Sequence, residues 1–123
     1  MTLELHLEGT ALDAGVARRA VMQFVGDEGS VDFVRDALLL TSELVSNAAL
    51  YAPGSGSLTA RLARDALRVE VSDCSPVLPN LTVAADLPDV GGRGLQIVEN
   101  LATSWGAHPT DQGKTVWFEL ALR

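Results

Sequence analysis

The chain is 123 residues long, with 47% hydrophobic and 20% charged residues, which is the length and balance of one globular domain. Its formal net charge of −7 and the lack of any run of lysine or arginine exclude a basic groove for nucleic acid. One cysteine, Cys74, and two well-separated histidines exclude a disulfide framework and a cysteine-rich zinc site, and they argue against a metal site built from imidazoles.

The first half of the chain is predicted to form one strand and two helices. Residues 2–7 alternate leucines with polar side chains, which is typical of a half-buried strand. Asp13 is a candidate N-cap for a first helix that ends before the glycines of residues 26–29. A longer helix is expected over residues 31–52, because a proline and a glycine follow it directly.

The second half is predicted to form two hairpins, with an irregular segment and a third helix between them. The irregular segment contains three prolines. The expected ranges are strands 58–64 and 67–73, irregular segment 74–90, helix 92–103, and strands 105–108 and 114–122 joined by a turn at 111–113.

Paired strands with helices between them, and no regular βαβ alternation, predict an α+β fold. We expect a two-layer sandwich in which about three helices cover one face of a mostly antiparallel or mixed sheet. No internal repeat or low-complexity segment divides the chain, so residues 1–123 are expected to form a single domain. The irregular segment of about 17 residues is long for such a domain, and segments of that length are usually lids or binding loops.

A polar stripe on the second helix is the first candidate site. Between Arg35 and Arg61 the chain contains no lysine or arginine, and the helix is apolar nearly all round. Glu43 and Asn47 stand one helical turn apart on its polar stripe. A carboxylate in such surroundings must be paired, hydrated or close to a cation. The stripe is therefore either an ordinary exposed face or part of a binding site.

Asp73 is the second candidate. It ends the strand at 67–73, and a period of two places it on the same face as the apolar residues of that strand. The carboxylate therefore emerges on the apolar face, in position to accept a hydrogen bond from the amino group of a buried ligand. An Asx-type turn that opens the following loop is the alternative interpretation.

A glycine cluster at residues 91–94, interrupted by Arg93, precedes and opens the third predicted helix. Glycine lets the backbone approach a ligand closely, and the free N–H groups of a helix N-terminus attract phosphate. The spacing matches neither a P-loop nor a dinucleotide fingerprint. By itself such a cluster is a weak signal, because most glycine clusters before helices are loop ends.

The order of these features resembles the Bergerat-fold ATPases, the superfamily of gyrase, the heat-shock chaperones, sensor histidine kinases and mismatch-repair proteins. Within it, the chain is most similar to the serine-kinase anti-sigma factors of bacteria. The resemblance covers nearly the whole chain. It is carried by Glu43-Leu-Val-Ser-Asn47-Ala48, Val71-Ser-Asp73, Gly92-Arg-Gly94-Leu95-Gln-Ile-Val-Glu99-Asn100 and Gly113-Lys114-Thr115.

The resemblance implies a role for each matching residue. Asn47 would ligate Mg²⁺, which bridges the phosphates of ATP. Glu43 would be the general base that takes the proton from a serine of a partner protein. Asp73 would hydrogen-bond the adenine amino group, and Thr115 would support the same ring.

The start of the third helix would hold the phosphates of the nucleotide. Gly92 and Gly94 would let the chain wrap around them, with Arg93 and Leu95 in the same nucleotide-binding segment, and residues 77–90 would form the lid. Magnesium would offset the phosphate charge that a chain of net charge −7 would otherwise repel. Positioning and charge neutralisation are most of what phosphoryl transfer demands.

The chain departs from the family pattern close to the predicted base site. Asp73 is followed by Cys-Ser-Pro, where the wider superfamily has two glycines, and Leu50 stands where sensor kinases often have a basic residue. Sensor-kinase activity also needs a phosphoaccepting histidine on a separate dimerisation helix, whereas His6 lies in a predicted strand. The residues after Asp73 concern the shape of the adenine loop, and Leu50 concerns the phosphate contacts. The position of His6 argues against sensor-kinase activity.

The function that the resemblance implies is an ATP-dependent serine protein kinase that binds a sigma factor and phosphorylates a small antagonist protein, as a homodimer. Two alternatives stay open: a non-catalytic ATP-binding module, and a nucleotide-free interaction protein that kept only the fold. A cytoplasmic location is expected, because no apolar run approaches the ~20 residues of a membrane span. The first residues also lack the pattern of a signal peptide.

Overall fold

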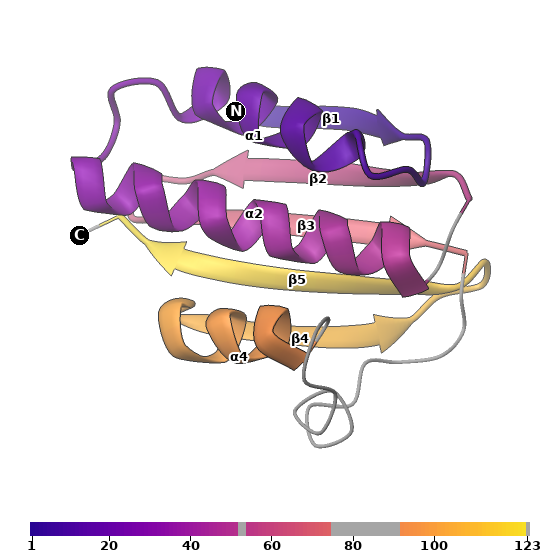
Figure 1. Cartoon of the computed structure of the whole chain (residues 1–123). Coiled ribbons are helices and arrows are strands. Elements are labelled where there is room, and N and C mark those ends of the chain that lie inside the picture. Colours follow the sequence, from indigo (N-terminus) through magenta and orange to yellow (C-terminus); the bar gives the residue numbers. More distant parts are fainter. Residues whose placement is uncertain (52–53, 75–91, 123) are drawn as a thin grey trace.

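A computed structural model describes residues 1–51, 54–74 and 92–122, without the side chains of residues 51 and 92–96. The predicted lid at 77–90 lies outside the described residues. The elements are shown in Figure 1. They are β1 (Thr2–Leu7), α1 (Asp13–Val25), α2 (Val31–Tyr51), β2 (Gly56–Leu62), β3 (Ala66–Asp73), α4 (Gly92–Leu101), β4 (Ser104–Pro109) and β5 (Lys114–Ala121).

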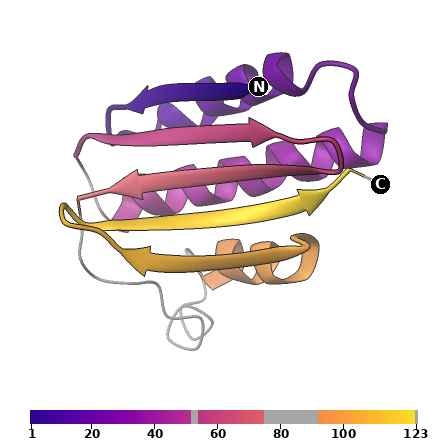
Figure 2. The same cartoon turned by 180° about the vertical axis from the view of Figure 1, so that it is seen from behind.

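The strands form one five-stranded sheet in the order β1-β2-β3-β5-β4. Every neighbouring pair is antiparallel. The three helices α1, α2 and α4 of the described residues lie on one face of this sheet, and the reverse view shows its other face uncovered (Figures 1 and 2). The predicted α+β sandwich is confirmed, and the sheet is antiparallel throughout rather than mixed.

The core lies between the sheet and the helices. Burial alternates along β3, where Leu67, Val69 and Val71 are buried and the residues between them are only half-buried. The alternation follows from the period of two in a strand with one covered face. Opposite this face, α2 buries Leu40 and Val45 completely. Each such aliphatic side chain contributes about 1.5–3 kcal/mol through burial.

The uncovered face of the sheet is polar, as a solvated face requires. Arg68 lies at its centre, with Nε 2.8 Å from Glu70 Oε2 and Nη1 3.1 Å from Glu119 Oε2. Its guanidinium carbon stands 4.1 Å from the centre of the Trp117 ring. A cation above an aromatic face is an electrostatically favourable contact. These pairs give order to a surface that no helix covers.

Asp13 is not the N-cap that its position predicts. It is the first residue of α1, the N-cap position is Leu12, and the side chain of Leu12 makes no cap hydrogen bond. The Asp13 carboxylate instead turns back and accepts three backbone N–H groups, from Glu8 (3.2 Å), Gly9 (2.8 Å) and Thr10 (3.2 Å). Three donors satisfy a buried carboxylate better than a single cap bond does, so Asp13 closes the β1–α1 connection.

The other predicted boundaries differ from the structure by a few residues. The second predicted strand is shifted, because β2 starts at Gly56, which pairs with Leu7 of β1. The helix expected over 92–103 ends at Leu101, since the Thr103 N–H bonds to the Glu119 carbonyl of β5. No helix of the described residues has the length and apolar character needed to cross a membrane.

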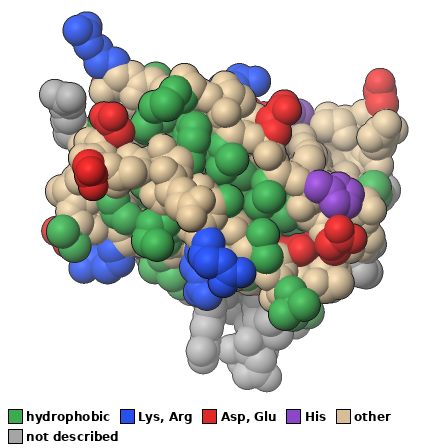
Figure 3. Space-filling model, turned by 90° about the horizontal axis from the view of Figure 1, so that it is seen from above, with side chains coloured by type: hydrophobic (Ala, Val, Ile, Leu, Met, Phe, Trp, Pro, Cys, Tyr) green, Lys and Arg blue, Asp and Glu red, His purple; other side chains and the backbone are tan. Residues whose placement is uncertain are grey.

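One side of the molecule, formed by α1 and β1, exposes apolar side chains. On α1 these include Val16 and Met22, which are 41% and 49% exposed. Seen from this side, hydrophobic side chains gather between the charged ones (Figure 3). Single exposed apolar residues are common on protein surfaces, so exposure by itself assigns no role to them.

Candidate functional site

Glu43 and Asn47 lie one turn apart in the C-terminal half of α2, and both are half-buried. Between them in the sequence, Leu44 and Val45 face the core and are almost fully buried. The polar stripe therefore borders the core instead of standing free in solvent. Burial raises the pKa of the Glu43 carboxyl above its ordinary value, because desolvation penalises the charged form.

The side-chain amide of Asn47 has a polar atom with no protein partner. Its nitrogen, Nδ2, is buried and has no hydrogen bond within the described part of the chain. An unsatisfied buried N–H group costs about 1–3 kcal/mol, and native structures contain few of them. A half-turn of the side chain exchanges the amide oxygen and nitrogen, so this position can offer either a donor or an acceptor to a ligand.

Asp73 lies on the apolar face of β3, as the period of two predicts, and its side chain is only 4% exposed. The ammonium of Lys114 is 2.9 Å from Oδ2 and 3.1 Å from Oδ1 of this carboxylate. The two residues are direct cross-strand partners of β3 and β5, so their side chains share one face of the sheet. The Lys114 side chain is 9% exposed, and the contact is therefore a buried ion pair.

Thr115 does not lie beside Asp73. It pairs with Ser72 in the β3–β5 register, one position away, and a step of one residue moves a side chain to the other face of the sheet. There its hydroxyl is 2.7 Å from that of Ser72. The residue that faces Asp73 is Lys114, and the support of the adenine ring by Thr115 stays a prediction.

Lys114 was missed in the sequence, although two signals mark it. It is the only lysine of the chain, and it is the first residue of β5. A lysine at the end of a strand would ordinarily extend into solvent. Its burial depends on Asp73, 41 residues earlier in the chain, and no local pattern reports a contact over that separation.

The backbone at this end of the sheet is closely packed, and Gly113 is required there. A Cβ atom at position 113 would overlap the backbone carbonyl oxygen of Asp73 and lie 2.7 Å from the Cα of Cys74. Because backbone atoms cannot move aside like a flexible side chain, any larger residue would push β5 away from β3. Gly113 therefore fixes where Lys114 enters the sheet.

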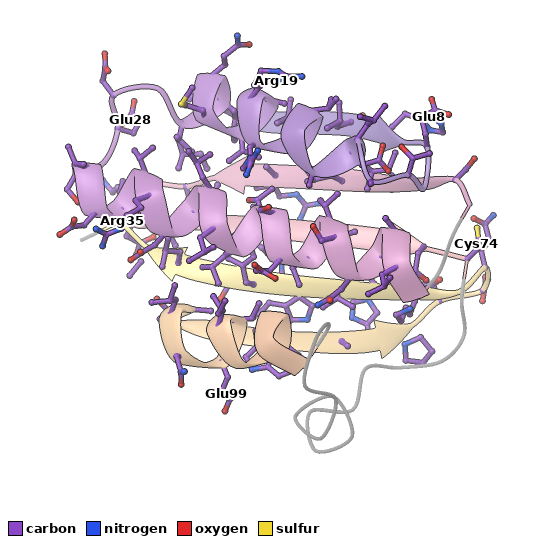
Figure 4. The ribbon with its side chains drawn as sticks, viewed as in Figure 1. Glu8, Arg19, Glu28, Arg35, Cys74 and Glu99 are labelled. Atoms are coloured by element: carbon purple, nitrogen blue, oxygen red, sulfur yellow. The ribbon has the colours of Figure 1, made fainter. Side chains whose placement is uncertain are left out.

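The glycine-rich segment forms the first turn of α4. Gly92 begins the helix, and the backbone of Arg93, Gly94 and Leu95 continues it. The side chains of Arg93 and Leu95 lie outside the described residues. Later in the helix Val98 is fully buried, while Glu99, on the outside in Figure 4, accepts a hydrogen bond from the Trp105 indole. The segment thus opens a helix, as predicted, and the later residues of that helix have a buried and an exposed side.

The candidate residues gather toward one end of the sheet. Helix α2 packs on β3 and β5 and beside α4. Its C-terminal half, which carries Glu43 and Asn47, lies above the end of β3 and the start of β5 (Figure 1). Cys74, labelled in Figure 4, marks this end of β3 directly after Asp73. The N-terminus of α4 is directed toward the same end.

The comparison with known families identifies the fold. The family described as the histidine kinase-like ATPase domain matches residues 9–120. This chain belongs to that family. Curated proteins gave no match. Membership implies nucleotide binding.

Two solved structures resemble this ATPase domain in fold. The first contains the RsbU and RsbW domains of Rv1364c from Mycobacterium tuberculosis, with a TM-score of 0.76 and 21% identity, and the match covers 99% of this chain and 32% of that one. The second is a histidine kinase domain from a blue-light activated histidine kinase of Erythrobacter litoralis, with a TM-score of 0.56 and 21% identity over 91% of this chain and 60% of that one. This chain therefore spans a third to about three fifths of those two chains.

The donor set of the ATPase domain suits a magnesium nucleotide. The described residues contain no group of three or more histidine, cysteine or acidic side chains that could hold a metal ion. Magnesium in phosphate sites is commonly held by one or two protein oxygens, water and the phosphates themselves. The amide of Asn47, with its unpaired buried atom, can supply one such oxygen. The residues present therefore fit a Mg²⁺ ion that arrives with its nucleotide.

A shallow hollow, open to solvent, also reaches Asp73. Its other walls come from the β1–α1 connection, the C-terminal end of α2 and the chain before β2. It is lined by Leu7, Gly9, Asp13, Ala48, Ala49, Gly54, Gly56, Ser72 and Asp73. Neither Glu43 nor Asn47 contributes to it, so this hollow, whose walls include the β1–α1 connection, is distinct from the polar stripe of α2.

Proposed function

We propose that this ATPase domain binds ATP with Mg²⁺ and transfers the terminal phosphate to a serine of a small antagonist protein, and that it also sequesters a sigma factor. The observation that carries the proposal is the pair on α2. A carboxyl whose pKa is raised by burial stands one turn from an amide with an unpaired buried atom. One group can accept a proton and the other can hold a metal–phosphate ligand.

Glu43 is suited to act as the general base. A general base works best when its pKa lies near the operating pH, and burial moves the Glu43 pKa upward from 4.5. In the transfer, the serine oxygen forms a bond to the γ-phosphorus while the bond to the ADP oxygen breaks. The serine proton passes to a carboxylate oxygen of Glu43, and ADP leaves with the bridging oxygen.

Asn47 is the residue proposed to hold Mg²⁺. When bound, the ion supplies charge neutralisation and fixes the β- and γ-phosphates. The protein groups do the rest by position: Asp73 accepts a hydrogen bond from the base at the end of β3, and Gly92 and Gly94 present backbone N–H groups at the start of α4. Such N–H groups favour phosphate at a helix N-terminus. Arg93 and Leu95 belong to the same segment of the proposed site.

The partners and the setting are proposed from two supports. The resemblance in the motifs implies a sigma factor, an antagonist and a homodimer in the cytoplasm, and the fold likeness to a protein with an RsbW domain is consistent with it. The apolar surface of α1, with Val16 and Met22, is available for protein contact. The polar and acidic character of the chain, at a net charge of −7, does not favour direct contact with nucleic acid.

The test separates nucleotide binding from transfer. Wild type and Glu43→Gln are titrated with Mg-ATP by calorimetry, and both are incubated with labelled ATP and the small antagonist domains encoded by neighbouring reading frames. We expect equal nucleotide affinity and loss of transfer only in Glu43→Gln. Glu99→Gln, which changes an exposed carboxylate on α4, is the control and should transfer normally.

Each contrary outcome has a distinct meaning. Binding without transfer to any antagonist by wild type would replace the kinase with a non-catalytic ATP-binding module. Absence of binding heat in wild type would refute nucleotide binding altogether and leave an interaction protein that kept the fold.

A further inference from the structure

The buried lysine that pairs with Asp73 has no role in the function proposed above. Lys114 is 7% exposed as a residue, and lysine is among the side chains least often buried without a reason. A buried ion pair is weak support for a purely structural role, because apolar residues of similar volume are often neutral or stabilising in its place. The Asp73–Lys114 pair therefore calls for a functional explanation.

The neighbouring cross-strand pairs show what a structural solution looks like on this face. Moving inward from the pair, β3 and β5 place Val71 opposite Val116 and Val69 opposite Phe118. All four of these residues are buried. Charge enters only at the last position, where the sheet meets the C-terminal half of α2. The exchange of apolar for charged residues thus coincides with the candidate site.

The geometry of the pair leaves donor capacity on the lysine. An ammonium carries three N–H groups, and two of them suffice for the contacts of 3.1 and 2.9 Å to the two Asp73 oxygens. The third N–H can donate to a ligand that approaches the same carboxylate. A carboxylate and an ammonium side by side offer an acceptor and a donor next to each other, and on adenine the exocyclic amino donor likewise stands beside ring nitrogens that accept.

We propose that Asp73 and Lys114 together read the base of the nucleotide: the carboxylate accepts from the exocyclic amino group of adenine, and the Lys114 ammonium donates to a ring nitrogen that flanks it. This inference rests on the proposed nucleotide binding and adds a specificity-determining residue to it. Two ring nitrogens, N1 and N7, flank the amino group, and both accept hydrogen bonds. Lys114 also keeps the buried carboxylate neutralised, so the site is ordered before the base arrives.

The experiment compares ATP with two analogues, each as its magnesium complex. In 1-deaza-ATP and in 7-deaza-ATP a C–H group replaces one of the flanking nitrogens. A hydrogen bond to a charged group contributes roughly 1.5–3 kcal/mol, which corresponds to an affinity ratio of about 10-fold or more. We expect one of the two analogues to bind wild type about 10-fold more weakly than ATP. This measurement needs no substitution and so does not depend on how a variant folds.

A variant then assigns that discrimination to the lysine. Lys114→Met keeps the length of the side chain and removes the ammonium, and it should bind ATP more weakly but no longer distinguish ATP from the affected analogue. Arg61→Met, which removes one positive charge from an exposed position of β2, should bind all three nucleotides as wild type does. If Lys114→Met does not fold, the double variant Asp73→Asn/Lys114→Met, which leaves no buried charge, replaces it.

Four results would overturn the inference. Equal binding of ATP and both analogues by wild type would show that no flanking nitrogen is read. If Lys114→Met binds ATP as wild type does and still discriminates between ATP and the analogue, another group reads the ring nitrogen. If Lys114→Met binds both nucleotides more weakly but still discriminates between them, the lysine lies near the phosphates. Wild type that binds no adenine nucleotide would refute the proposed function together with this inference, whereas the first three results leave nucleotide binding standing.

Discussion

The Asp73–Lys114 pair gives the sharpest stability prediction. Removing one partner should strongly lower the free energy of unfolding, whereas removing both should restore most of it. Lys114→Met leaves a carboxylate that is 4% exposed without its ammonium. Asp73→Val leaves a lysine side chain that is 9% exposed without its carboxylate. Breaking a buried pair in this way costs about 3–5 kcal/mol, since an uncompensated charge remains buried.

The double variant Asp73→Val/Lys114→Met should recover most of that loss. It extends the apolar ladder formed by Val71 and Val116 by one more position, and apolar replacements of buried pairs are often neutral or stabilising. The coupling between the two positions should therefore be several kcal/mol, far above the ~0.5 kcal/mol within which independent sites add. The double variant should at the same time lose its affinity for Mg-ATP, because no group is left to read the base.

The assay is urea unfolding followed by circular dichroism, with calorimetry of Mg-ATP binding on the same preparations. Midpoints are compared at an unchanged slope, so that the shift reports stability alone. Arg61→Met serves as the control for loss of one positive charge. Single variants that each cost less than about 1 kcal/mol, as exposed pairs do, would refute the description of this contact as a buried ion pair.

Three further predictions concern other residues. Asn47→Ala should be no less stable in urea than wild type, because it removes an unpaired buried N–H group, yet it should lose Mg-ATP binding; a clear drop in stability would show that the amide has a structural partner. The raised pKa of Glu43 means that the folded state binds the carboxyl proton more tightly than the unfolded state does. The protonated carboxyl therefore contributes to the free energy of unfolding below pH 4.5, and this contribution is lost as the pH rises through the pKa of the folded state. Glu43→Gln should therefore gain stability relative to wild type at pH 7 compared with pH 4, and an equal difference at both values would contradict the pKa shift. Asp13→Ala should lower the unfolding free energy by about 2–3 kcal/mol, since the carboxylate accepts three backbone N–H groups, and thermal unfolding that matches wild type would refute its role in closing the β1–α1 connection.

The fold could be predicted largely from local patterns. The alternation in β3 gave the buried face and placed Asp73 on it, because a strand with one covered face repeats every two residues. The position of Glu43 one turn before Asn47 likewise needed only the helical period. The roles of Glu43 and of the glycine-rich start of α4 remain predictions, since no ligand contact tests them.

Two details of the structure are not readable from the sequence, one because it depends on strand register and one because it depends on the conformation of a turn. The resemblance implies that Thr115 supports the base, a role that stays a prediction, while the β3–β5 register turns its side chain away from Asp73 and brings Lys114 to that carboxylate. Asp13 was read as a helix cap, but its partners lie in the preceding turn. In both cases the residue type indicates a polar contact, and only the three-dimensional arrangement shows which groups meet.

The distribution of positive charge leads to a last prediction, on magnesium. Among the described side chains Lys114 is the only buried cation, and the arginines between residues 18 and 68 are exposed or half-buried. If Lys114 serves the base, no buried cation of the described residues is left for the phosphates of a nucleotide in a chain of net charge −7. Charge neutralisation then falls to Mg²⁺, to Arg93 of the proposed phosphate segment and to the N-terminus of α4, whose dipole is equivalent to only about half a charge.

ATP affinity should therefore depend strongly on the metal. We expect chelation of magnesium with EDTA to weaken ATP binding to wild type by at least about 10-fold, which is about 1.4 kcal/mol. AMP, whose single phosphate needs little neutralisation, should be affected far less. Calorimetric titrations of both nucleotides with and without EDTA measure the two ratios, and equal ATP affinity in the two conditions would show that cationic side chains, not a metal ion, hold the phosphates.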